Sequence, residues 1–138
     1  MHTRGLFAPE TETTVRERYE ALGLPAQVVV KESARAMGFD AEEYGERVTS
    51  DVVATGRDAL FASLLSVRVG TSAEFDAWRE EHPGYDVSEN GSPDVGQVAW
   101  HAAPFADAVV TATFENEEDA AVATVQRIAF GRLYRDAL

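Results

Sequence analysis

Two stretches near the C-terminal end of the chain, Gln97–Ala103 (QVAWHAA) and Ala108–Phe114 (AVVTATF), decide the fold. Side chains alternate between the two faces of a strand, so Val98, Trp100 and Ala102 lie on one side of the first stretch. Four residues separate the stretches, and Pro104 among them presets φ for a turn. The pattern predicts two strands joined as a hairpin.

The residues that follow, Asn116–Leu138, have the pattern of one long helix. Asn116 is a good N-cap, acidic residues come next, and Arg132 and Arg135 lie near the other end, as the helix dipole favours. The apolar residues form two stripes, one of Ala121, Val125, Ile128 and Leu133 and one of Ala123, Phe130, Tyr134 and Leu138. A helix against a single sheet needs one stripe, so we expect the second to meet the N-terminal half or another copy of the chain.

The N-terminal half is predicted to be helical. Residues 1–9 are expected to form an arm anchored by Leu6 and Phe7. Four helices are predicted, at Glu10–Leu22, Pro25–Met37, Asp40–Val48 and Asp51–Leu65. The last of these is apolar nearly all round, which predicts a central buried helix. Gly56 within it costs about 1 kcal/mol relative to Ala, which a close helix contact could offset.

The middle of the chain joins the two halves without a linker. A short strand is predicted at Ser66–Gly70, a helix at Ala73–His82, a strand at Tyr85–Ser88 and a mobile polar loop at Asn90–Asp94. The sequence therefore predicts a single α+β domain. Its helical half, about 1–65, is fused to a β-α-β-β-β-α half, about 66–138. A small antiparallel sheet of three to four strands is covered by the long C-terminal helix.

The composition is strongly acidic. Among the 138 residues, 24 are Asp or Glu and 12 are Lys or Arg, giving a net charge of −12, and Lys31 is the single lysine. The acids are spread along the chain, a pattern typical of proteins adapted to molar salt, where the Debye length shrinks to about 3 Å. We therefore expect a halophilic archaeal protein whose acidity reflects the solvent and not a basic partner.

The same composition limits the compartment. No apolar run is long enough to span a membrane, and no apolar stretch as long as that of a signal peptide follows the N-terminal residues. A cytoplasmic protein is therefore expected. With no Cys, disulfide and thiolate chemistry are excluded.

One set of candidate ligands is His82, Asp86 and His101. If Tyr85–Ser88 pairs with Gln97–Ala103, Asp86 and His101 could approach each other, and two imidazoles with a carboxylate suit Zn²⁺ or Fe²⁺. The three residues are not at any metal-motif spacing. His82 is more simply a helix end before Pro83, and His101 a surface residue on a strand. We predict no metal and no cofactor.

A helix-turn-helix is a second interpretation, because small, turn and core residues fall loosely where that motif needs them, at Ala34, Gly38, Tyr44 and Val48. The helix that would contact DNA carries three acids, Glu42, Glu43 and Glu46, against Arg47 alone. DNA affinity comes largely from phosphate neutralisation, so nucleic-acid binding is not expected.

Two further sets could form a binding surface. Arg127, Arg132 and Arg135 on the final helix could clamp a phosphate or carboxylate, although pairing with nearby acids is the simpler reading. Five residues are candidates for a ligand groove or a dimer contact: Trp100, His101, Phe105, Phe130 and Tyr134. Aromatic residues at core spacing are normally core, which is the alternative. The chain has no GxGxxG, Walker A, GxSxG or HExxH motif, and no catalytic residue is assigned.

Five stretches resemble a known family: 7–10 (FAPE), 18–22 (RYEAL), 57–64 (RDALFASL), 100–105 (WHAAPF) and 129–136 (AFGRLYRD). The whole chain is similar to a family of small, acidic haloarchaeal proteins of unknown function. The resemblance implies a haloarchaeal, cytosolic protein and implies no activity.

These observations favour a non-catalytic interaction or regulatory module that self-associates through its final helix. An alternative is a small-molecule or metal-dependent enzyme that uses His82, Asp86 and His101. A third is a nucleic-acid-binding regulator.

Overall fold

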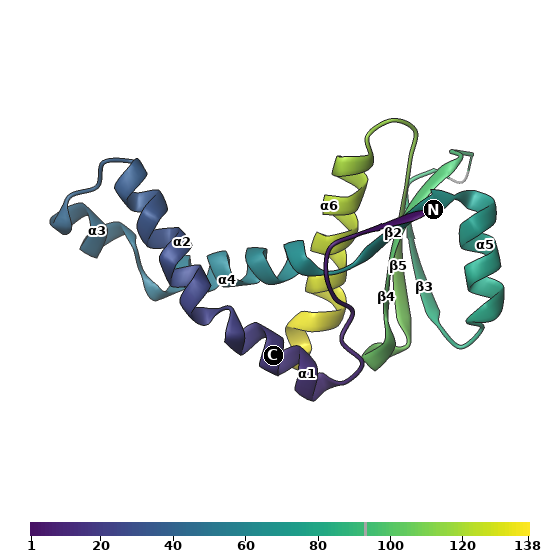
Figure 1. The fold of residues 1–138 in the computed structure, drawn as a ribbon, viewed down its shortest axis with the longest axis horizontal. Helices are drawn as coiled ribbons and strands as arrows, with labels where there is room; N and C mark the ends of the chain where they lie inside the picture. The colour runs from purple at the N-terminus through teal and green to yellow at the C-terminus, as the bar shows by residue number, and fades with distance from the viewer. Residues whose placement is uncertain (93) are drawn as a thin grey trace.

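The structure, a computed structural model, describes residues 1–92 and 94–138. A five-stranded sheet has helices on both faces, and a helical extension stands away from it (Figure 1). The strands are β1 (His2–Arg4), β2 (Val67–Thr71), β3 (Asp86–Asn90), β4 (Gln97–Ala103) and β5 (Ala108–Phe114). The α-helices are α1 (Glu12–Ala21), α2 (Gly23–Ala36), α3 (Ala41–Arg47), α4 (Ser50–Leu64), α5 (Ser72–Glu81) and α6 (Glu118–Ala129). The predicted α+β class is confirmed.

The β4–β5 hairpin forms as its sequence predicts, with both strands beginning and ending at the expected residues. Its antiparallel register places Trp100 opposite Thr111 and Ala103 opposite Ala108. A short 3₁₀ turn, Pro104–Ala106, closes it, followed by Asp107 in the left-handed region at φ 46°. Asp tolerates this backbone conformation better than most residues.

The sheet is mixed, so the predicted antiparallel sheet of three to four strands is wrong in two respects. Its strand order is β1-β2-β4-β5-β3, and β3 runs parallel to β5. The pairing of Tyr85–Ser88 with Gln97–Ala103, which was the condition for bringing Asp86 near His101, therefore does not occur. A strand–helix–strand crossover through α5 makes β3 run in the same direction as β2, which suits a parallel place beside β5. The expected N-terminal arm supplies the fifth strand, because His2–Arg4 pairs with β2.

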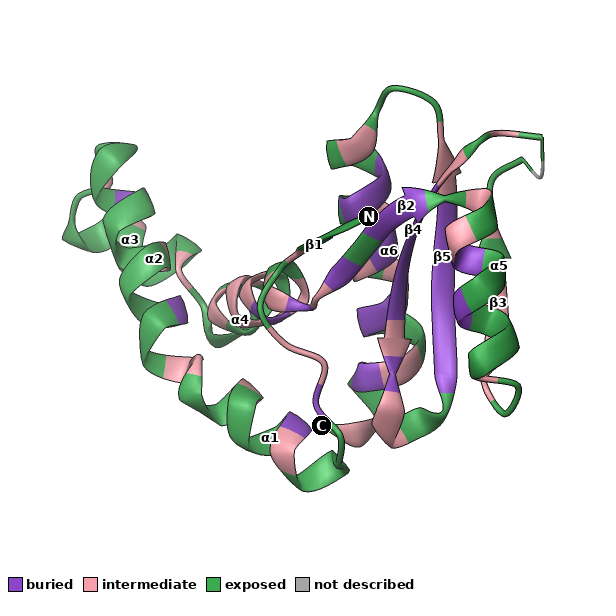
Figure 2. Ribbon diagram, turned by 45° about the vertical axis from the view of Figure 1, so that its right-hand side comes forward, coloured by how far each residue is buried: buried purple, intermediate pink, exposed green. Residues whose placement is uncertain are grey.

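Helices cover the two faces of the sheet (Figure 2), and a separate cluster of side chains is buried on each face. Val98, Trp100 and Val109, from alternate positions of β4 and β5, face α5 and pack with its Phe75 and Trp78. The other face packs against α1, α4 and α6 in the main core, which includes Val15, Phe61, Ala99, Val110, Val122 and Val125. Helices from both halves of the chain thus share one core with the sheet.

The final helix is shorter than predicted. Instead of running over Asn116–Leu138, α6 ends at Ala129 and continues as a wider π-helical turn, Phe130–Tyr134, and a short 3₁₀ turn. Asn116 is not the cap, because α6 begins after Glu117 without a side-chain cap. The wider turn places Phe130 and Tyr134 on the same side, where their ring centroids lie 5.8 and 5.4 Å from that of Phe61. Both rings thus pack against Phe61 in the main core.

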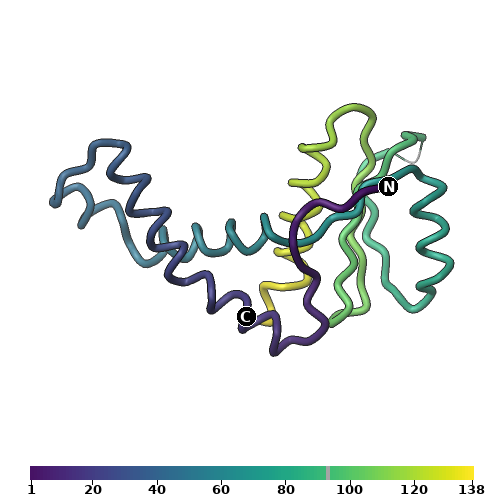
Figure 3. Tube along the Cα trace, viewed as in Figure 1, coloured from purple at the N-terminus to yellow at the C-terminus, as the bar shows by residue number. Residues whose placement is uncertain are grey.

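The helical extension consists of α2, α3 and the first half of α4, and Figures 1 and 3 show it projecting away from the sheet. The prediction that Asp51–Leu65 forms a central buried helix is wrong, because Phe61 is the buried residue of α4. The helix enters the core at its C-terminal end and has α2 as its main neighbour elsewhere. There, a Cβ on Gly56 would lie 3.2 Å from Val30 Cγ2, which is the close helix contact expected at this glycine.

The acidic side chains lie on the surface. Among the described residues, the buried polar side chains are His101 and Thr111, and no Asp or Glu is buried. The predicted loop at Asn90–Asp94 includes Pro93, which lies outside the described residues. Asn90 itself ends β3, and its Nδ2 donates to the Thr111 carbonyl at 3.1 Å. In the part of the chain that is described, no helix has the length and apolar character needed to cross a membrane.

Candidate interaction surface

His101 is a core residue and not the surface residue predicted. Strand β4 turns it toward α6, where it is fully buried. Its Nδ1 lies 2.6 Å from the Ser66 carbonyl oxygen and its Nε2 lies 2.6 Å from the Tyr134 hydroxyl. A carbonyl oxygen can only accept, so Nδ1 carries the proton and Nε2 accepts from Tyr134. Burial lowers the pKa of His101 to about 4, outweighing the opposing effect of the Ser66 hydrogen bond.

The structure does not bring His82 and Asp86 to His101. His82 ends α5 on the opposite face of the sheet, where its ring stacks on Trp78 with centroids 4.2 Å apart. Its Nδ1 lies 2.7 Å from the Trp78 carbonyl oxygen. Asp86 is exposed on the edge strand β3. Within residues 1–92 and 94–138, no group of three His, Cys, Asp or Glu side chains is placed to hold a metal ion.

The aromatic residues proposed as a ligand or dimer surface lie mostly inside the molecule. Trp100, Phe130 and Tyr134 are buried, on the α5 side for Trp100 and on the α6 side for the other two. Phe105 is half-buried, with its ring centroid 5.0 Å from that of Tyr134. The second apolar stripe of the final helix is thus partly covered by α4 of the same chain.

The three arginines near the C-terminus do not form a common clamp. Arg135 lies 3.9 Å from Asp58 and over the Phe130 ring, and Arg132 donates to the Ser88 hydroxyl. The Arg127 side chain makes no ion pair or hydrogen bond within the described residues. Two of the three thus have partners within the chain.

The segment considered as a helix-turn-helix forms the outer end of the extension (Figure 1). Gly38 has φ 77° and Asp40 caps α3 by accepting from the Glu43 N–H. The seven residues of α3 include no buried side chain, and three of them are Glu. An exposed acidic helix of this kind repels the phosphates of a nucleic acid.

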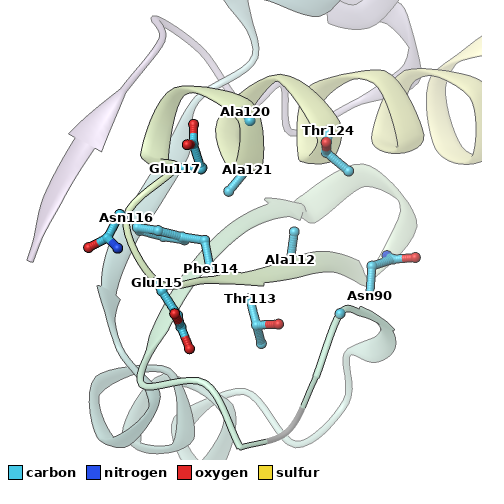
Figure 4. A pocket seen from close by; sticks show the side chains of 11 residues that line it. Asn90, Ala112, Thr113, Phe114, Glu115, Asn116, Glu117, Ala120, Ala121 and Thr124 are labelled. Atoms are coloured by element: carbon cyan, nitrogen blue, oxygen red, sulfur yellow. The ribbon is translucent and has the colours of Figure 1, made fainter.

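A hollow of about 450 Å³ lies between the start of α6 and the ends of β3 and β5 (Figure 4). Ala112 and Ala121 lie between the strand and the helix, and the carboxylates of Glu115 and Glu117 point to different sides of the connecting loop.

The extension carries most of the exposed apolar surface. Nine large apolar side chains of the described residues are exposed, and six of them lie between residues 24 and 52: Leu24, Val28, Val29, Met37, Tyr44 and Val52. In contrast, Ala26 and Ala34 are the buried residues of α2. Short helices depend on tertiary packing for most of their stability, and here that packing is thin.

A groove of about 420 Å³ runs along this extension, between α2 and the α3–α4 corner. Leu24, Val28 and Lys31 of α2 line one side, and Tyr44 and Val53 line the other. Sequence reasoning missed this surface. The signal was available, because α2 has two apolar stripes: Ala26, Val30 and Ala34 face α4, whereas Leu24 and Val28 face the groove.

Comparison with known families agrees with the resemblance in part. Residues 6–135 match a family of unknown function, DUF5809, and the chain belongs to that family. No curated protein and no solved structure matches the chain.

Proposed function

We propose that this member of a family of unknown function is a non-catalytic interaction module of a salt-rich cytosol, and that it self-associates through its helical extension. The observation that carries the proposal is the concentration of exposed apolar side chains on α2, α3 and the first half of α4. The final helix, first considered for this role, has Phe130 and Tyr134 packed inside its own chain.

Burial of this surface would stabilise the extension. Leu24 is 70% exposed and Met37 is 69% exposed. Covering a large aliphatic side chain fully contributes about 1.5–3 kcal/mol. Monomeric proteins rarely expose many large apolar side chains in one region, and such concentrations commonly mark interfaces.

A second copy of the chain is the partner that the surface fits. A two-fold interface uses the same patch on both copies, so that patch must be complementary to itself. The extension offers both exposed apolar side chains, Leu24 and Val28, and a groove that can receive the same side chains of the other copy. Lys31 adds a positive charge to the groove, and the surface of a second copy is rich in carboxylates.

The size of the surface predicts a reversible dimer. The 14 residues of α2 span about 21 Å, and two adjacent helices about 10 Å wide give a footprint on the order of 400 Å². Weak, transient complexes bury less than about 600 Å² on each partner. We therefore expect a dissociation constant on the order of micromolar.

Sedimentation velocity in molar KCl, over a range of protein concentrations, tests the proposal. The wild-type chain should shift from monomer to dimer as concentration rises, and Leu24→Glu should remain monomeric. Leu6→Glu is the matched control, because Leu6 is equally apolar, 78% exposed and outside the extension. A wild type that stays monomeric throughout, or a Leu6→Glu variant that dissociates as readily as Leu24→Glu, would overturn the proposal.

A further inference from the structure

Helix α2 exposes two different apolar faces, and only one of them can lie at the centre of a symmetric contact. Val28 and Val29 are almost equally exposed, at 50% and 48%. They are neighbours in sequence, but successive side chains of an α-helix point about 100° apart. Val28 lines the groove, whereas Val29 does not.

We infer that α2 of one copy lies antiparallel against α2 of a second copy, with Val28 close to the two-fold axis. This inference rests on the proposed self-association and specifies its geometry. In this arrangement, α2 and α4 of each copy form a four-helix bundle with the same helices of the other copy.

The groove-facing side of α2 has the pattern of a helix contact. Leu24, Val28 and Lys31 lie at positions i, i+4 and i+7, which form one stripe along a helix. Apolar side chains from outside α2, including Tyr44 and Val53, extend the same surface. On the Val29 side, the residues one turn further along are Glu32 and Ser33, which are exposed and polar. A dry contact therefore forms more readily on the Val28 side.

The charge of the molecule favours the antiparallel orientation. Each copy carries a net charge of −12, and the extension projects away from the sheet (Figure 3). Antiparallel helices place the two sheets at opposite ends of the bundle, whereas parallel helices place them side by side and bring their acidic surfaces together. Antiparallel helix dipoles also attract each other at their ends.

Lys31 has a defined place in this arrangement. The residues three and four positions away on α2 are Gln27, Val28, Ala34 and Arg35, so the helix offers Lys31 no acidic neighbour. Within the described residues, Lys31 makes no ion pair. Its aliphatic stem can cover apolar surface at the contact while its ammonium group reaches carboxylates of the other copy.

Engineered cysteines test the geometry directly, because the natural chain contains none. A disulfide requires the two Cα atoms to lie within about 7 Å. Under mild oxidation at a concentration where the dimer is populated, Val28→Cys should form a covalent dimer rapidly. Val29→Cys, the matched control, should form it at least about tenfold more slowly, because its thiols point away from the axis. Sedimentation of both reduced variants verifies that each still associates.

The outcomes separate the inference from the proposed function. If the chain self-associates and Val29→Cys cross-links as fast as Val28→Cys, or Val28→Cys does not cross-link, this geometry is wrong and the self-association stands. If the wild-type chain shows no dimer at any concentration, the proposed function is wrong and the geometry falls with it.

Discussion

His101 and Tyr134 meet inside the core, where His101 Nε2 accepts a hydrogen bond from the Tyr134 hydroxyl at 2.6 Å. The other ring nitrogen donates to the carbonyl of Ser66, just before β2. One imidazole thus joins the central strand β4, the start of β2 and the π-helical turn after α6. Both ring nitrogens are satisfied, which is what a buried histidine requires. The two hydrogen bonds give His101 a structural role in the core.

Tyr134→Phe should destabilise the fold by about 1–3 kcal/mol, because it leaves the buried Nε2 of His101 without a donor. Chemical denaturation in constant molar KCl measures the free energy of unfolding. Tyr44→Phe removes a hydroxyl from an exposed ring and should change stability by less than about 0.5 kcal/mol. Equal effects of the two substitutions would show that the His101–Tyr134 hydrogen bond contributes nothing.

The pKa of His101 makes stability depend on pH. It is about 4 in the folded protein and about 6.5 in an unfolded chain. Between these values the unfolded chain binds more protons, so stability falls as the pH drops, by at most about 1.4 kcal/mol per unit. Above about pH 6.5 the neutral, buried His101 makes its full contribution to the free energy of unfolding. Below about pH 4 this contribution is lost, because the imidazole is protonated in both states.

The variant His101→Gln should lose this part of the pH dependence. Burial of the neutral imidazole is its cause, and glutamine does not titrate. The measurement is the difference between the wild-type and variant free energies of unfolding from pH 7 to pH 4. Carboxylates such as Glu118, whose pKa is lowered mainly by its hydrogen bond with His2, titrate in both proteins and cancel. A difference that stays constant with pH would mean that His101 does not titrate as described.

Gly5→Ala should detach the N-terminal strand. Gly5 has φ 83°, and a Cβ built there would lie 2.2 Å from the Leu65 carbonyl oxygen. The backbone must move, which weakens the Leu6 N–H to Leu64 carbonyl bond and the pairing of β1 with β2. Strain of this kind costs about 1–3 kcal/mol. Hydrogen exchange should show faster exchange of the β1 amides, with little change in α6.

Gly84→Ala is the control for that experiment, because no atom lies within 4 Å of a Cβ built at Gly84 and its φ is not positive. If the β1 amides of Gly5→Ala exchange as slowly as those of Gly84→Ala and the wild type, the close approach of Gly5 to Leu65 is not needed to hold the strand.

Local pattern was enough to predict the β4–β5 hairpin to the residue. Alternation along Gln97–Ala103 and Ala108–Phe114 and the turn at Pro104 are properties of a short stretch of chain. The order of elements after residue 65 was predictable for the same reason. The strand order in the sheet was not predictable, because the crossover through α5 depends on packing over the whole sheet. His82 and His101 are far apart because His82 follows α5 on one face of the sheet, whereas His101 faces α6 on the other.

Burial of whole helices was less predictable than their positions. The apolar composition of α4 suggested a central helix, but composition does not say which neighbours a helix will have. Phe61, near the C-terminal end of α4, packs in the main core beside the sheet, whereas Val52, near its start, is exposed to solvent. For the same reason the exposed surface of α2 was missed, although Leu24 and Val28 stand at helical spacing. An apolar stripe in a sequence predicts a contact without saying whether the same chain provides it.

The positive charge at the groove gives a final prediction, about Lys31. Each copy carries a charge of −12, so dimerisation brings like charges together, and Lys31 reduces this repulsion at the contact. Lys31→Glu should weaken self-association about tenfold at low salt, equivalent to about 1.4 kcal/mol. The difference should shrink in molar KCl, where the Debye length is about 3 Å. Lys31→Arg should associate like the wild type, because it keeps the positive charge.

Arg68→Glu is the control for net charge. It makes a similar charge change on β2, outside the extension, at an exposed residue without an ion pair in the described chain. Sedimentation equilibrium of the four proteins gives the dissociation constants. If Arg68→Glu weakens the dimer as much as Lys31→Glu, net charge alone governs association and Lys31 does not lie at the contact.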